Sequence, residues 1–214
     1  MHIEICIEDA SGEKFLDVML PKLLVGGDVT WRVHGYKGIG RIPKNLTKGV
    51  DVKTKTLLDK LPNLLRGFAK TPGIDAVVFV VDTDDRDCAV FLAELKAVEN
   101  SVHPSPNTTL FRLAIEEMEA WYFGDPAAIK KAYPSVKIIQ IQNYQLDSVC
   151  GTWERLADAI VPGGAAKLKS DGWPASGVAK SEWAVRITPY MNPDENMSPS
   201  FQKFRDGMRD LMRI

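Results

Sequence analysis

The chain has 214 residues, of which 45% are hydrophobic and 26% are charged, and its formal net charge is −1 at pH 7. This composition indicates one globular domain with a small appendage and excludes a globally basic protein, so any nucleic-acid partner must meet a local patch. We find no signal peptide and no membrane-length apolar run, and the three widely spaced cysteines form no CxxC motif. These features favour a cytoplasmic protein with reduced thiols and no membrane contact.

The first predicted strand covers residues 3–7 and ends at Glu8. Apolar residues at helical spacing then predict a helix over residues 15–23, for which Ser11 is the expected N-cap. Pro21 is expected to kink or shorten this helix. Glu8 therefore lies at a strand-to-helix turn.

A short strand over residues 29–33 is followed by a loop, residues 34–41, that contains three glycines, one lysine and one arginine. The loop matches neither the Walker A motif nor GxGxxG. Two interpretations stay open: a phosphate-binding loop that uses backbone N–H groups with Lys37 or Arg41, or a plain surface loop. We interpret His34 as a structural or surface histidine.

Six apolar residues at 76–81 predict a strand buried on both faces, and Asp82 and Asp84 follow it directly. In an extended loop, acids two positions apart can point the same way. Such acids repel each other unless a cation lies between them, and Mg²⁺ or Mn²⁺ is the usual partner. The alternative is a solvated acidic turn that caps the next helix, with Asp85 or Asp87 as its N-cap.

The pattern further predicts helices over residues 57–68 and 88–98 and a fourth strand over 108–115. This β-α-β-α-β-α-β order argues for a mostly parallel, Rossmann-like sheet of about four or more strands with helices on both faces. An acidic cluster that includes Glu117 and Glu119 follows the fourth strand. Ligand sites lie at the carboxyl ends of such strands, although acids near a helix start are also favoured by the helix dipole.

The character of the chain changes at about residue 134. Helices are predicted over residues 153–160 and 200–212, and a run rich in Gly, Pro and Lys lies between them at residues 162–180. We interpret this C-terminal third as helical packing plus long loops. We therefore divide the chain into an α/β core, residues 1–133, and a C-terminal helical and loop extension, residues 134–214, packed on the core. Four basic residues of the extension are expected near the acidic edge, namely Lys167, Lys169, Lys180 and Arg186.

A glutamate after the first strand and an Asp-x-Asp after a later strand, here Glu8, Asp82 and Asp84, resemble the signature of the Toprim domain of topoisomerases, primases and certain nucleases. The resemblance implies that the acids hold one or two Mg²⁺ or Mn²⁺ ions, which clamp a phosphodiester.

Further segments are spread over nearly the whole chain: Ile7-Glu8 with Ser11 and Glu13, His34-x-x-Lys37-Gly38, Asp87-Cys88, Arg112-Leu113-Ala114, Glu117 to Asp125, Lys180, Ile187-x-Pro189-Tyr190-Met191 and Ser200-Phe201. With the acids, they resemble the Toprim-related family called domain of unknown function 4276 (DUF4276). That family commonly has glycine where this chain has Asp9. The resemblance implies a Toprim-like fold and a role in bacterial defence beside a partner ATPase.

On this interpretation Glu8, Asp82 and Asp84 bind the first metal ion. Glu117 and Glu119 supply a second metal position or the base that activates water, and on a regular helix only one of the two can point into the site. Three cations are candidates for phosphate contact or transition-state stabilisation: Lys37, Arg112 and Lys180. The alternative role for Arg112 is a structural partner of one carboxylate.

Three functions stay open. The first is a Mg²⁺- or Mn²⁺-dependent phosphodiesterase that acts on DNA or RNA. The second is a non-catalytic Toprim-like module that binds a nucleotide or an ATPase partner, and the net charge favours it because autonomous nucleases usually carry a basic surface. The third is a small-molecule phosphotransfer or nucleotide enzyme built on the same metal site.

Overall fold

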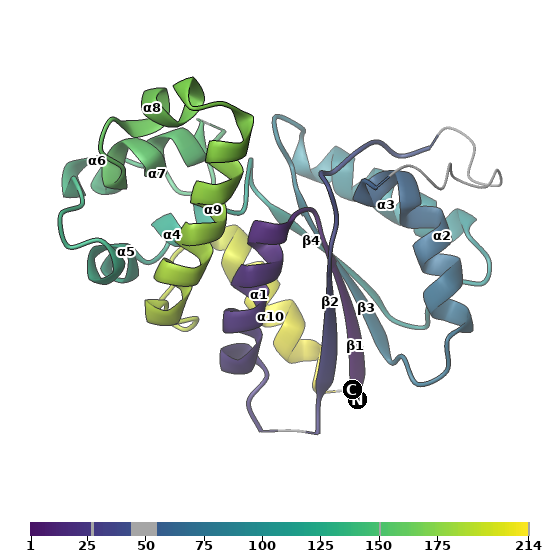
Figure 1. Ribbon diagram of the computed structural model, residues 1–214. Coiled ribbons are helices and arrows are strands. Elements are labelled where there is room, and N and C mark those ends of the chain that lie inside the picture. Colours follow the sequence, from purple (N-terminus) through teal and green to yellow (C-terminus); the bar gives the residue numbers. More distant parts are fainter. Residues whose placement is uncertain (27, 44–54, 150, 214) are drawn as a thin grey trace.

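The computed structural model describes residues 1–26, 28–43, 55–149 and 151–213. Within these residues the centre of the molecule is an all-parallel sheet (Figure 1). Its four strands lie in the order β2-β1-β3-β4, with the bounds β1 His2–Ile7, β2 Thr30–Gly35, β3 Ala76–Asp82 and β4 Thr109–Ala114. The α/β class and the parallel sheet predicted from the alternating pattern are confirmed.

Helices cover both faces of the sheet (Figure 1). On one face, α2 (Leu57–Lys70) and α3 (Cys88–Ser101) enclose an apolar cluster that includes Val77, Phe79 and Val81. On the other face, α1 (Ala10–Leu23) and α10 (Pro199–Leu211) enclose a second cluster with the alternate residues of β3. The continuous apolar run of β3 is thus explained by burial on both sides.

The remaining helices lie beyond α1 on its side of the sheet (Figure 1). They are α4 (Ala120–Phe123), α5 (Pro126–Ala132), α6 (Ile138–Gln142), α7 (Thr152–Ile160), α8 (Gly164–Ser170), α9 (Trp173–Ile187) and the 3-10 turn η1 (Thr188–Tyr190). The division proposed at residue 133 falls between α5 and α6 and stays a prediction. The apolar cluster on the α1 face contains residues from both sides of that position.

The C-terminal part was expected to combine helices with long loops, and most of its Gly-, Pro- and Lys-rich run, residues 162–180, forms α8 and the first half of α9. Gly163 and Gly172 precede these helices with positive φ angles of 84° and 89°, which glycine adopts without strain. Pro174 lies in the first turn of α9, where a helix needs no N–H donor. The glycines and the proline therefore mark helix starts.

The helix ends differ from expectation at one cap. Asp9, and not Ser11, is the N-cap of α1, because its carboxylate accepts hydrogen bonds from the Gly12 N–H (2.8 Å) and the Ser11 hydroxyl (2.7 Å). Asp87 caps α3 by accepting from the Val90 N–H, as the alternative interpretation of the acidic turn expected. The first helix continues past Pro21 to Leu23.

Cys6 is buried in β1, Cys88 is partly exposed, and Cys150 lies outside the described residues. Among the helices that the structure describes, none combines the length and the apolar character needed to cross a membrane.

Candidate functional site

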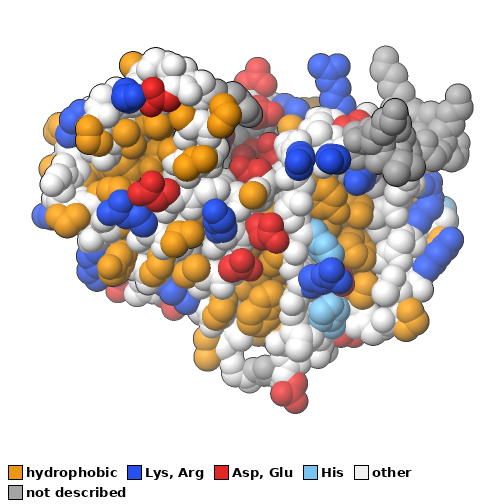
Figure 2. Space-filling model, in the orientation of Figure 1, with side chains coloured by type: hydrophobic (Ala, Val, Ile, Leu, Met, Phe, Trp, Pro, Cys, Tyr) orange, Lys and Arg blue, Asp and Glu red, His pale blue; other side chains and the backbone are white. Residues whose placement is uncertain are grey.

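The loops that follow β1, β3 and β4 leave the sheet at one edge. Ile7 lies opposite Val80, and Asp82 lies opposite Ala114, so the next residues of each strand reach the same level. They border a cleft of about 1030 Å³. Its acidic residues are Glu8, Asp9, Asp82, Asp84 and Glu117, with Glu182 further along α9, and its basic residues are Lys14, Lys37, Lys180 and Arg186. Figure 2 shows acidic side chains in the hollow above the strand ends, with Lys and Arg side chains beside it.

A buried threonine joins two of these loops. The Thr83 backbone N–H donates to the Ala114 carbonyl (2.9 Å), and its hydroxyl accepts from the Glu116 N–H (2.8 Å). The Asp84 N–H in turn donates to the Glu116 carbonyl (3.0 Å). Asp84 and Glu116 have positive φ angles of 49° and 59°, a conformation that is costly for residues other than glycine. The three hydrogen bonds thus hold a strained pair of turns at the edge of the cleft.

The acids at the floor of the cleft resist ionisation. Burial, followed by the negative charges of Asp84 and Asp9, raises the pKa of Glu8 to about 7. Burial and then the charges of Glu8 and Glu119 raise the pKa of Asp82 well above its ordinary value. Repulsion between these carboxylates thus adds to the effect of burial on both pKa values.

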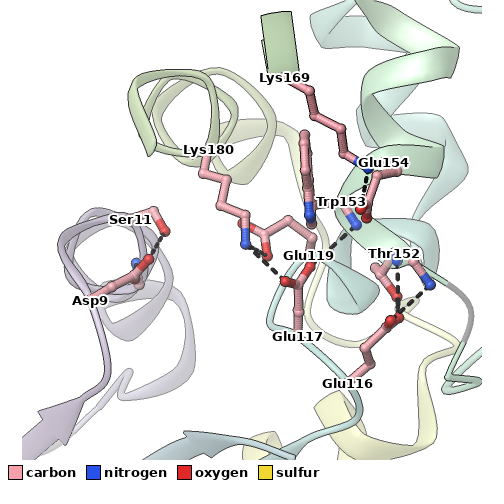
Figure 3. A network of polar contacts seen from close by, with 12 residues as sticks. Asp9, Ser11, Glu116, Glu117, Glu119, Thr152, Trp153, Glu154, Lys169 and Lys180 are labelled. Atoms are coloured by element: carbon pink, nitrogen blue, oxygen red, sulfur yellow. Dashed lines mark hydrogen bonds and ion pairs between the residues drawn. The ribbon is translucent and has the colours of Figure 1, made fainter. Parts of the chain in front are cut away.

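Lys180 of α9 lies between two acids of the loop after β4 (Figure 3). Its Nζ is 3.2 Å from Glu117 Oε1 and 3.3 Å from Glu119 Oε2. Burial lowers the pKa of Lys180, but attraction to Glu119, Glu117 and Asp82 outweighs it, so the net pKa is raised. Residues 115–119 form turns before α4 begins, so both glutamates can contact one ammonium. The prediction that only one of them could point into the site assumed a regular helix.

Among the buried carboxylate oxygens of the described residues, two lack a hydrogen-bond partner. They are Glu8 Oε2 and Glu119 Oε1. Glu119 is almost completely enclosed beneath the cleft, with 2% of its side chain exposed. A buried carboxylate oxygen without a donor is costly. Glu8 lines the cleft, so its Oε2 is suited to accept a bond from a ligand, whereas Glu119 does not line the cleft.

The acidic loop also holds the start of α7 (Figure 3). The Glu116 carboxylate accepts from the Gly151 N–H (2.7 Å) and the Thr152 N–H (2.9 Å), and also from the Thr152 hydroxyl. Glu117 Oε2 accepts from the Trp153 N–H at 3.3 Å. Carboxylates at a helix N-terminus satisfy free N–H groups, so Glu116 has a structural role here.

Most residues predicted for the site lie together. Six of them line the cleft, namely Glu8, Lys37, Asp82, Asp84, Glu117 and Lys180. Glu119 does not line it but forms an ion pair with Lys180. Arg186 also lines the cleft, whereas Lys167 pairs with Asp171 and Lys169 pairs with Glu154. The glycine-containing loop contributes Lys37 and Gly38, and the Gly38 N–H donates to the Glu8 carbonyl (3.0 Å).

Arg112 lies apart from this site. Its guanidinium donates to the Lys203 carbonyl (2.8 Å) and the Phe111 carbonyl (2.9 Å) and packs on Gly207 of α10. It lines a separate cleft of about 580 Å³ beside β4 and α10. A Cβ atom at position 207 would collide with the Arg112 guanidinium, which explains the glycine. The structure therefore does not bring Arg112 to the acids. His34 likewise pairs with Glu4 on the sheet.

The acids fit a hard divalent cation by their chemistry, because carboxylate oxygens are the preferred ligands of Mg²⁺ and Mn²⁺. The buried, unpartnered Glu8 Oε2 and the mutual repulsion of the acids agree with that preference. In the described part of the chain, no three Asp, Glu, His or Cys side chains form a group that could hold a metal ion. Binding therefore requires the carboxylates to turn toward one another.

Several cleft residues were not identified from the sequence as part of the site, among them Asp9, Lys14 and Trp153. Asp9 was masked by its neighbour Glu8, and Lys14 lies one helical turn further along α1. Trp153 carries no local signal, because only the packing of α7 brings it beside Glu117.

Comparison with protein-family models gives a match over residues 7–209 to the family described as Domain of unknown function (DUF4276). The searches of curated proteins and of solved structures found no match.

Proposed function

Because the chain belongs to the DUF4276 family, whose description gives no reaction, we propose from the geometry of the cleft that it is a Toprim-type phosphodiesterase that acts on nucleic acid with Mg²⁺ or Mn²⁺. One observation carries the proposal: Glu8, Asp82 and Asp84, from two neighbouring parallel strands, line one cleft, and the pKa of Glu8 and of Asp82 is raised by burial and nearby negative charge. The Toprim assignment and a role in bacterial defence are parts of the same proposal.

In this proposal Glu8, Asp82 and Asp84 hold the cation. When bound there, a divalent cation supplies Lewis-acid stabilisation of phosphoryl oxygens and a more acidic water. Lys37 and Lys14, at the border of the cleft, attract and orient the phosphate. Glu117 takes the proton of the attacking water or adds a ligand, and Lys180 sets its position and charge.

The test is cleavage of plasmid DNA and single-stranded RNA with Mg²⁺ or Mn²⁺. Asp82→Asn and Glu8→Gln should each reduce the rate at least about 100-fold, because a metal ion contributes several kcal/mol to such a transition state. Isothermal titration should show that both variants lose Mn²⁺ binding. Asp85→Asn is the matched control, because Asp85 is an exposed acid of the same loop outside the cleft lining. Cleavage by Asp82→Asn at the wild-type rate would indicate a contaminating nuclease and would contradict the assignment of Asp82 as a metal ligand.

A non-catalytic binding module that works with an ATPase is the second candidate. It is favoured by the net charge of −1 and by Lys180, whose ammonium already balances Glu117 and Glu119. This candidate predicts that Mn²⁺ binds without cleavage of any nucleic acid, both alone and with the co-purified ATPase. Cleavage that appears only in the presence of the ATPase would instead indicate that the partner supplies the basic surface.

A further inference from the structure

An aromatic side chain stands directly beside the acids of the cleft. Trp153 is the second residue of α7, and its backbone N–H donates to Glu117 Oε2 (3.3 Å), which holds the start of α7 next to the acidic loop. Trp153 is partly exposed and lines the cleft. Figure 3 shows it between Lys180 and Lys169, and Lys169 Nζ lies 5.5 Å from the ring centroid.

The part of α9 that lines the same cleft carries polar and charged side chains together with a few apolar ones. Val178 and Val185 line it with 67% and 52% of their surface exposed, and Pro174 and Gly177 lie beside them. A Cβ atom added at Gly177 would meet no atom within 4 Å, so the space there is open. A partly exposed aromatic ring and exposed apolar side chains in one cleft suit a flat, weakly polar group.

The cleft therefore offers two kinds of contact. Its charged residues Glu8, Asp82, Lys14 and Lys37 suit a metal-bound phosphodiester. The Trp153 ring, which lines the same cleft, suits a nucleobase. A volume of about 1030 Å³ is at the upper end of the range for small-ligand sites and accommodates a short stretch of an extended strand.

We propose that Trp153 is a stacking platform for a nucleobase next to the scissile phosphate, and that the substrate is single-stranded nucleic acid. This inference rests on the proposed function, since it places the phosphodiester over the acids. A base inside a duplex is already stacked on both faces, so only an unpaired or extruded base can stack on the indole. Stacking accepts every base, so no sequence preference is expected from this contact.

The experiment measures binding of a fluorescent single-stranded pentanucleotide in the presence of Ca²⁺. The same pentanucleotide with abasic sugars and a hairpin duplex serve as comparison probes. Wild-type protein should bind the base-containing strand about 10-fold more tightly than the abasic strand, in line with the loss of one stacked base. Trp153→Ala should remove this difference, Trp153→Phe should restore most of it, and Trp31→Phe, a change in β2 outside the cleft lining, should leave it unchanged.

Equal binding of the base-containing and abasic strands by wild-type protein would overturn the inference, and this comparison needs no variant to fold. Binding of the duplex as tightly as the single strand, or of none of the probes, would also overturn it. Binding is read without turnover, so the two proposals can fail separately. Base-dependent binding without cleavage would contradict only the proposed nuclease activity. Cleavage that is unaffected by replacement of Trp153 would contradict only the stacking role of Trp153.

Discussion

Lys180 is the residue on which the charge balance of the cleft depends. It contacts Glu117 and Glu119 from a helix that begins more than 50 positions later in the chain, and Glu119 keeps one oxygen without a hydrogen-bond partner among the described residues. Replacing one partner of such a cluster leaves like charges facing each other in a poorly solvated place.

Lys180→Met should therefore lower the free energy of unfolding by about 3 kcal/mol at pH 8. Loss of the ammonium raises the pKa of both glutamates further, so they stay protonated in the folded protein at pH 5.5 and the loss there should be smaller. Urea denaturation at the two pH values measures this difference. Lys167→Met is the control, because Lys167 forms an exposed i,i+4 pair with Asp171 and should cost less than about 0.5 kcal/mol. Equal losses in the two variants would contradict the role assigned to Lys180.

The acids of the cleft also predict how stability depends on pH. The pKa of Glu8 and of Glu117 is raised from 4.5 to about 7, mainly by burial. Between these values the folded state retains protons that the unfolded state has lost, so stability should fall as the pH rises from about 4.5 to 7 and then level off. Thermal unfolding in the presence of a chelator measures this trend.

A divalent cation should offset the loss, because it binds the deprotonated carboxylates. We therefore expect Mn²⁺ to raise the melting temperature more at pH 8 than at pH 5. Glu8→Gln should remove most of this increase. An effect of Mn²⁺ that is the same at both pH values would argue against binding to these acids.

At the scale of the elements, the two turns after β3 and β4 are held by Thr83. Thr83→Val keeps the volume but removes the acceptor of the Glu116 N–H, and an unpaired buried N–H costs about 1–3 kcal/mol. We expect lower stability by that amount and faster hydrogen exchange at Glu116. Mn²⁺ affinity should fall as well, because Asp84 shares these turns.

Thr83→Ser keeps the hydroxyl and serves as the control for this change. It should retain the slow exchange at Glu116 and nearly all of the Mn²⁺ affinity. A Thr83→Val protein with unchanged exchange at Glu116 would show that other contacts hold the turns.

At the scale of the molecule, one apolar cluster joins the sheet to the C-terminal helices. Phe15 of α1 contacts Trp121 (ring centroids 5.4 Å apart) and Phe201 of α10 (6.5 Å), and all three side chains are fully buried. Buried aromatic side chains contribute several kcal/mol each. The α1 face of the sheet is therefore covered by residues from the far end of the chain.

A fragment that ends at residue 133 should not fold cooperatively, because it would expose this face. Circular dichroism and thermal unfolding should show a broad transition or none, while the full chain unfolds in one step. Addition of residues 134–214 as a separate polypeptide should restore the transition. A sharp transition of the fragment alone would show that the sheet with its first helices is self-sufficient.

Much of the fold follows from local patterns in the sequence. The apolar run of β3 and the β-α alternation predict the parallel sheet, and the acids Glu8, Asp82 and Asp84 are predicted at strand ends because the carboxyl ends of parallel strands share an edge. No helix was predicted within residues 162–180, because glycine and proline at helix starts resemble loop signals.

What the sequence by itself determined is the class of the fold and the shared edge of its acids, since periodicity and strand direction are encoded over a few neighbouring residues. Lys180 was expected near the acidic edge, but only the tertiary structure decided which acids it contacts, that Trp153 adjoins Glu117 and that Arg112 lies elsewhere. These contacts join residues that are distant in the chain. Their geometry depends on how whole helices pack, and no short segment of the sequence predicts that packing.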